Sequence, residues 1–155
     1  MNITNNWKYE EWANEMKKSP YDTSYDIQRY INYEIYAEDI EIISTILLPI
    51  TFEYKGLILL DREGGCEEEV RDNFDSGLLN IPDMTELQES MNRLIVRDVF
   101  FNTADKSSDS TIMNVAKLIQ HNWTYYLIKE YPSRRFKVEI VGEDFYPVVT
   151  FYEVP

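Results

Sequence analysis

The spacing of apolar residues changes at Pro49, and this change limits the fold more than any other feature of the sequence. Before Pro49, apolar side chains recur at steps of three and four residues, which is typical of an amphipathic helix; they are Ile27, Tyr30, Ile31, Ile35 and Ile42. After it, residues 51–54 and 57–61 form two short β-rich runs around Lys55-Gly56, which indicates a hairpin. A proline cannot continue a helix interior because it lacks the N–H donor. The chain therefore combines helices with strands.

Two helices are expected before Pro49. The first covers residues 7–18, and Asn5 or Asn6 can cap it by accepting a backbone N–H hydrogen bond. Its acids come early and its lysines late, as the helix macrodipole favours. The second helix is predicted to begin after Asp22 or Thr23 and to continue as far as Leu48.

Three more helices are expected in the rest of the chain. A short one covers residues 67–74, and another begins at Pro82-Asp83 with an apolar face that extends to Ile95. Residues 102–110 are polar and predict a loop. A long helix then covers residues 110–130, capped by Ser108 or Asp109 and ended by Pro132.

Residues 135–141 and 147–153 predict two further strands. Together with the hairpin they give an antiparallel sheet of about four strands, with helices covering one face and Trp123 and Phe136 in the core between them. No repeat or linker interrupts the pattern. The prediction is therefore one α+β domain over residues 1–155.

The composition predicts a cytoplasmic protein. Hydrophobic residues make up 44% of the 155 residues, which is enough for a packed core. The single cysteine, Cys66, excludes a disulfide within the chain and a zinc site of the usual cysteine type. The N-terminus lacks the pattern of a signal peptide, and the longest apolar run, residues 42–52, is too short to span a bilayer.

The net charge of −13 is concentrated in the middle of the chain. Residues 61–110 carry 5 basic and 13 acidic groups, whereas residues 111–155 carry 5 of each. Such a charge repels nucleic-acid phosphate and anionic lipid, so neither nucleic acid nor a membrane is an expected partner. A basic protein is the partner that the charge favours.

The acidic stretch 61-DREGGCEEEVRDNFD-75 has several interpretations. A calcium loop of the EF-hand type is excluded by the spacing, because the fifth position counted from Asp61 is Gly65 and the sixth is Cys66. Catalytic carboxylates need one desolvated and one solvated environment, which this hydrophilic stretch does not indicate. Two interpretations stay open: the solvated face of a short helix, and an acidic surface that recognises a basic partner.

If the stretch is a recognition surface, all of its carboxylates are candidates for partner binding. They are Asp61, Glu63, Glu67, Glu68, Glu69, Asp72 and Asp75. The alternative interface is a tyrosine-rich face, with Tyr25, Tyr30, Tyr33 and Tyr36.

No pattern of catalytic or metal-binding residues is present in the sequence. His121 is the only histidine, which leaves a zinc site without ligands and a general base without an obvious helper. Cys66 precedes three glutamates, whose charge raises a thiol pKa and disfavours the reactive thiolate. We therefore predict that the chain is not an enzyme and has no catalytic residue, cofactor or metal.

Two motifs carry a resemblance to a known class of proteins. They are P-x-x-F-E-x-x-G-x-x-x-L at residues 49–60 and W-x3-L-x3-Y-P-x-R-x-F-x-V at residues 123–138. Their combination resembles small acidic bacterial proteins of the type that provides immunity in polymorphic toxin systems. The resemblance carries over no functional residue.

The resemblance implies a non-enzymatic protein that binds and neutralises a cognate toxin. Many such toxins are nucleases with a basic substrate groove, which an acidic inhibitor can occupy as a surrogate for phosphate. Two alternatives stay open: an inhibitor from a phage or mobile element that mimics nucleic acid against a host defence enzyme, and a structural subunit of a larger assembly. The sequence does not indicate the oligomeric state.

Overall fold

The computed structural model describes residues 6–18 and 25–155. The chain divides into two compact units, residues 1–44 and residues 45–155, and each is described by itself. The α+β class predicted from the sequence is confirmed. The single domain predicted for residues 1–155 stays a prediction.

Unit 1 contains α1 (Trp7–Met16), α2 (Ile27–Glu34) and the first part of α3 (Ala37–Leu47), whose residues 45–47 belong to unit 2. Asn6 caps α1, because its side chain accepts a hydrogen bond from the Lys8 N–H at 3.1 Å. Asp26 caps α2 in the same way. The caps predicted at Asp22 and Thr23, and the alternative cap Asn5, lie outside the described residues.

The single helix predicted up to Leu48 is wrong, since the structure divides it into α2 and α3. Ile35 has an extended backbone, with φ −114° and ψ 122°, which ends α2. The side chain of Asp39 then accepts a hydrogen bond from the Tyr36 N–H at 2.9 Å and satisfies a donor at the start of α3. The isoleucine spacing continues across this break, which is why it does not show in the sequence pattern.

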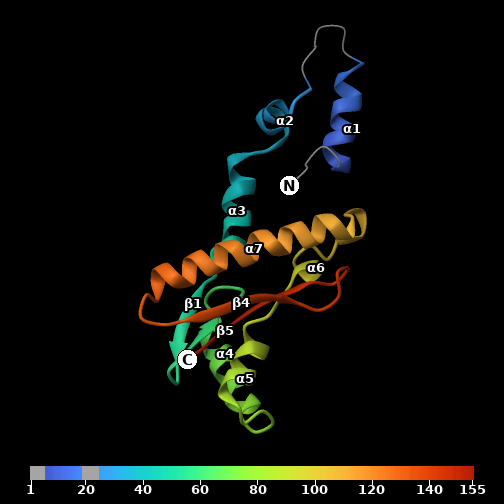
Figure 1. The fold of residues 1–155 in the computed structure, drawn as a ribbon. Helices are drawn as coiled ribbons and strands as arrows, with labels where there is room; N and C mark the ends of the chain where they lie inside the picture. Colours follow the sequence, from blue (N-terminus) through green and yellow to red (C-terminus); the bar gives the residue numbers. More distant parts are fainter. Residues whose placement is uncertain (1–5, 19–24) are drawn as a thin grey trace. The chain divides into compact units, whose positions relative to one another are not determined.

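After α3, unit 2 continues with a β-hairpin, and it ends with two longer strands (Figure 1). Its elements after α3 are β1 (Thr51–Tyr54), β2 (Leu57–Leu60), α4 (Glu67–Gly77), α5 (Met84–Met91), β3 (Leu94–Ile95), α6 (Val96–Val99), the 3₁₀ helix η2 (Ala104–Lys106), α7 (Asp109–Glu130), β4 (Phe136–Val141) and β5 (Val148–Glu153). The side chain of Ser108 caps α7, which is one of the two caps predicted. The side chain of Asp83 caps α5, so this helix begins at Met84, just after the predicted start at Pro82-Asp83. Lys55 and Gly56 both have positive φ, at 49° and 84°, and so form the tight turn that the hairpin requires.

The strands are antiparallel as predicted, but they form two sheets instead of one. β1 pairs with β2, and β5 lies between β3 and β4 in a separate sheet. The sequence pattern did not indicate β3. Leu94 and Ile95, expected on the face of a helix, instead pair with Val149 and Val148.

Helices pack on both faces of β5, because successive side chains of a strand point to opposite sides. Val149 and Phe151 lie in the core cluster that contains Trp123 of α7. Thr150 points the other way, and its hydroxyl donates to the Glu89 carbonyl of α5 at 2.7 Å. α7 and α5 thus cover opposite sides of β5 (Figure 1), whereas helices on only one face were expected.

The predicted packing of α7 against the C-terminal strands is confirmed. Trp123 is only 1% exposed, and its ring meets Phe151 edge to face with centroids 5.8 Å apart. Phe136 is half-buried and packs on the same Phe151 ring at 6.0 Å. None of the described helices has both the length and the apolar character needed to cross a membrane.

Candidate functional site

Two amide side chains, Gln88 of α5 and its C-cap residue Asn92, explain why β2 and β5 lie close together without pairing. Asn92 is fully buried: its carbonyl oxygen accepts from the Leu60 N–H at 2.8 Å, and its amide nitrogen donates to the carbonyls of Ile58 and Phe151 at 3.0 and 3.2 Å. Gln88 donates to the same Ile58 carbonyl at 2.9 Å. These side chains provide the hydrogen bonds that β2 and β5 would otherwise make with each other. They therefore hold together the two sheets that the structure has in place of the single predicted sheet.

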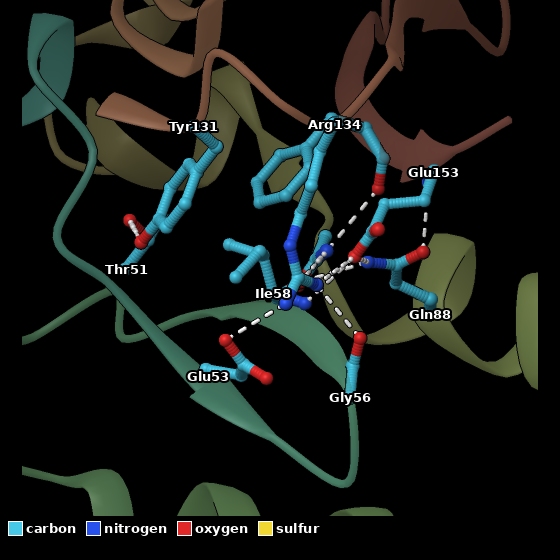
Figure 2. A network of polar contacts seen from close by, with 10 residues as sticks. Thr51, Glu53, Gly56, Ile58, Gln88, Tyr131, Arg134 and Glu153 are labelled. Carbon is cyan, nitrogen blue, oxygen red and sulfur yellow. Dashed lines mark hydrogen bonds and ion pairs between the residues drawn. The ribbon is translucent and has the colours of Figure 1, made fainter. Parts of the chain in front are cut away.

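Arg134 strengthens the same junction (Figure 2). Its guanidinium forms ion pairs with Glu153 at 3.0 Å and Glu53 at 2.7 Å, and it donates to the Gly56 carbonyl at 2.7 Å. Burial lowers the pKa of Arg134, but the hydrogen bonds and charges of the two glutamates outweigh it and raise the pKa above its usual value. Two glutamates of the chain itself neutralise this cation, so we interpret the network as a structural element and not as an anion-binding site.

Asp61 is held within the acidic stretch and does not face solvent. It is 2% exposed, and its two carboxylate oxygens accept the Gly64 N–H and the Cys66 N–H, both at 3.0 Å. Gly64 and Gly65 have positive φ, which lets the loop fold around this carboxylate. Asp61 therefore shapes the loop before α4, and the surface that a partner can reach begins at Glu63.

Glu67 and Asp75 are exposed but already paired. Glu67 binds Arg71 at 3.0 Å, one helical turn further along α4. Asp75 binds the Lys55 ammonium at 2.7 Å and accepts from the Tyr54 hydroxyl at 3.1 Å. The hydrogen bond from Lys55, together with that from Tyr54, holds the pKa of Asp75 below its usual value despite some desolvation. Both carboxylates thus help to hold the local structure.

Glu68, Glu69 and Asp72 form the exposed part of the stretch that has no compensating charge, and we call them the α4 acidic face. None of them has a hydrogen bond or ion pair with another residue of the described chain. The nearby cation of Arg71 lies over the Phe52 ring at 5.4 Å, toward the hairpin. The negative charge of the α4 acidic face is therefore left to the solvent.

A hollow of about 380 Å³ lies beside this face, between α4, α5 and the loop before α4. Glu63, Glu69 and Cys66 line it. Burial and then the charges of Glu63, Asp61 and Glu69 raise the pKa of the Cys66 thiol, as predicted from the sequence. Burial and the neighbouring carboxylates therefore disfavour the thiolate form of Cys66.

The tyrosine-rich alternative does not form one helix face. Tyr30 is half-buried on α2, while Tyr33 and Tyr36 are 63% and 70% exposed, and α2 ends before Tyr36. Tyr25 precedes α2, and its carbonyl accepts a hydrogen bond from the Tyr9 hydroxyl. The sequence spacing did not reveal this division, because it depends on the break at Ile35.

His121 is exposed on α7 and is not among the residues that line the hollow. Within the described ranges, no group of three or more histidine, cysteine, aspartate or glutamate side chains is arranged to hold a metal ion. Comparison with protein families, curated proteins and solved structures gives no match for this chain.

Proposed function

We propose that this chain is a non-enzymatic protein-binding domain that neutralises a basic protein partner through the α4 acidic face. The observation that carries the proposal is the contrast within one short stretch. Asp61, Glu67 and Asp75 are engaged by the protein itself, whereas Glu68, Glu69 and Asp72 are exposed and unpaired. Exposed carboxylates without neighbouring cations are the ones that a basic partner can engage without first breaking an internal ion pair.

The α4 acidic face is also well anchored. Phe74, on the opposite side of α4, is fully buried against Leu59 and Leu87. Asp61 fixes the loop that leads into the helix. A face held in place before binding loses little conformational entropy when a partner docks, which favours tight association.

The helix macrodipole explains part of the acidic stretch without any partner, because Glu67, Glu68 and Glu69 lie in the first turn of α4, where acids are favoured. Asp72 lies beyond the first turn, and Glu63 lies before the helix, so neither is explained in this way. These two residues extend the negative surface beyond what helix stability requires.

The partner that we propose is a protein with a basic surface. The net charge of −13 steers the chain toward a basic surface, and it accelerates encounter most at low salt. The substrate groove of a nuclease-type toxin is such a surface, since it holds phosphate, and the carboxylates of the α4 acidic face would occupy the phosphate positions. This is the behaviour expected of an immunity protein in a bacterial toxin system.

We expect no general base at His121. Its side chain is exposed and has no hydrogen bond to a carboxylate or hydroxyl in the described part of the chain. General base catalysis needs such a helper within hydrogen-bond reach.

The test compares two triple variants with the same change in net charge. In one, Glu68, Glu69 and Asp72 are replaced by lysine; in the control, the exposed residues Glu130, Glu143 and Asp144 are replaced by lysine. Each variant and the wild type are immobilised and exposed to a lysate of the source organism. A basic protein retained by the wild type and the control, but lost from the α4 variant, supports the proposal.

The captured protein then gives the quantitative measurement. Its association rate with the α4 variant should fall about tenfold or more at low salt, and the deficit should shrink as salt screens the charges. Its own activity should be blocked by the wild type. Equal association rates for the α4 and control variants, or a captured protein whose activity is unaffected, would contradict the proposal.

A further inference from the structure

Unit 1 contains a groove with a preformed aromatic floor. The groove has a volume of about 630 Å³ and is lined by residues of α1, α2 and α3 within unit 1. In its floor, the Trp12 and Tyr30 rings meet edge to face at 5.5 Å. Tyr9 packs against both rings, at 6.0 and 5.8 Å. Trp12 is only 7% exposed, so the floor is fixed by packing before anything binds.

The rim of the groove is apolar and strongly exposed. Trp7 is 40% exposed, and Ile40, Ile42 and Ile43 are 59%, 65% and 41% exposed. Isolated apolar residues on a surface are ordinary, but several that border one hollow typically mark an interaction site. The rim therefore provides apolar surface that a partner can cover.

Four exposed carboxylates share this rim: Glu11, Glu15, Glu34 and Asp39. Among the described residues that line the groove, Lys8 is the only cation, and its ammonium lies 6.0 Å from the centroid of the Trp7 ring. Burial and then the charge of Glu34 raise the pKa of Tyr30, so the negative field of the rim reaches the floor. The groove thus combines aromatic surface with excess negative charge.

We propose that this groove binds a basic amphipathic segment of a partner protein. Apolar side chains of the segment pack between the aromatic floor and the isoleucines, and its lysines or arginines meet the carboxylates of the rim. Cations of this kind also gain from the faces of tryptophan and tyrosine rings. The site is separate from the α4 acidic face, and the proposal does not depend on the function assigned to that face.

The charge of the groove favours a basic segment over a second copy of the chain. A symmetric contact between two grooves would bring each set of rim carboxylates toward the other, in molecules that each carry a net charge of −13. Like charges placed together in this way cost free energy of association. An anionic lipid surface is disfavoured for the same reason.

The test uses two synthetic helical peptides of equal length, each with leucine along one face. The polar face is lysine in the first peptide and glutamate in the second; a third peptide has the leucine–lysine composition in scrambled order. Binding is followed by NMR through the indole N–H signals of the tryptophans. Trp7 and Trp12 line the groove, whereas Trp123 is buried in unit 2 and donates to the Ile46 carbonyl at 3.0 Å, so its signal is an internal control.

The leucine–lysine peptide should shift the Trp7 and Trp12 signals in a saturable way and leave Trp123 unchanged. The glutamate and scrambled peptides should bind at least about tenfold more weakly, because each lacks one of the two features that the groove recognises. Equal binding of the lysine and glutamate peptides, or unchanged Trp7 and Trp12 signals, would overturn the proposal.

Three variants locate the site. Ile40→Ser should lower the affinity for the leucine–lysine peptide about tenfold. Ile128 on α7 is similarly exposed, and Ile128→Ser should leave this affinity unchanged. The triple lysine variant of the α4 acidic face should bind the peptide as tightly as the wild type does. The two proposals can therefore fail independently, and each failure gives a different result. Self-association of the wild type in sedimentation, abolished by Ile40→Ser, would assign the groove to a second copy and overturn the proposal.

Discussion

Trp12 in unit 1 and Trp123 in unit 2 are both buried, at 7% and 1% exposure, but they lie in very different surroundings. Trp123 belongs to a core cluster with residues from β2, α6, α7 and β5. Among the described residues of unit 1, only Trp12 and Ala13 are buried. Unit 2 therefore has a core of its own, whereas unit 1 exposes most of its apolar side chains. Few buried apolar contacts give low local stability, and segments that bind ligands are often drawn from such regions.

The largest expected effect tests this contrast directly. Trp123→Ala should reduce the free energy of unfolding by about 3–5 kcal/mol, because it leaves a large cavity in the core of unit 2. It also removes the indole N–H that donates to the Ile46 carbonyl. Urea unfolding followed by circular dichroism measures the loss.

Trp12→Ala is the matched comparison. It should speed amide hydrogen exchange in α1 and α2 but leave the urea midpoint of unit 2 unchanged, because the cluster around Trp123 contains no residue of unit 1. If Trp123→Ala left stability unchanged, the core of unit 2 would be wrongly assigned. If both substitutions lowered the same transition equally, the contrast between the units would be wrong.

A smaller but still clear effect is expected at the junction of the two sheets. Asn92→Ala should cost about 2–4 kcal/mol, because the buried Leu60 N–H and the carbonyl of Phe151 lose the partner that Asn92 provides. Asn80→Ala, at an exposed position after α4, is the control and should change stability by less than about 0.5 kcal/mol. Equal effects of the two substitutions in urea unfolding would mean that the amide network does not hold the sheets together.

Asn92 also shows where prediction from the sequence ended. The helix caps at Asn6 and Ser108 were among those predicted, because capping depends on a few neighbouring residues. The two sheets were not, because β2 and β5 are separated by Gln88 and Asn92, polar residues whose burial a periodic pattern does not reveal. β3 is too short, at two residues, to give a strand pattern of its own.

In the acidic stretch, too, some features were predicted from the sequence and others were missed. The exposure of Glu68, Glu69 and Asp72 followed from a hydrophilic, glycine-rich context, and the structure places them at the surface. The burial of Asp61 was missed, although a signal was present: an aspartate three residues before a glycine often accepts hydrogen bonds from the backbone of its own turn. The aromatic floor in unit 1 had no such signal, since it joins side chains from two helices.

Asp75 gives the smallest expected effect and sharpens the distinction between engaged and free carboxylates on α4. Its pKa in the folded protein is held below its ordinary value of 3.8, mainly by the hydrogen bond from Lys55. A lowered pKa contributes stability that is fully present above the unfolded-state value and is lost as the pH falls through the folded-state value.

The Asp75 pair should therefore contribute to stability at about pH 6 and progressively less below about pH 4. Asp75→Asn should lower the urea midpoint at the higher pH, and the difference from the wild type should shrink toward about pH 2.5. Asp72→Asn, which removes a carboxylate without an ion-pair partner in the described chain, is the control on the same helix. If the urea midpoint of Asp72→Asn differed from the wild type with the same pH dependence, the change at Asp75 would reflect overall charge. Asp75 would then belong with the unpaired carboxylates of the α4 acidic face.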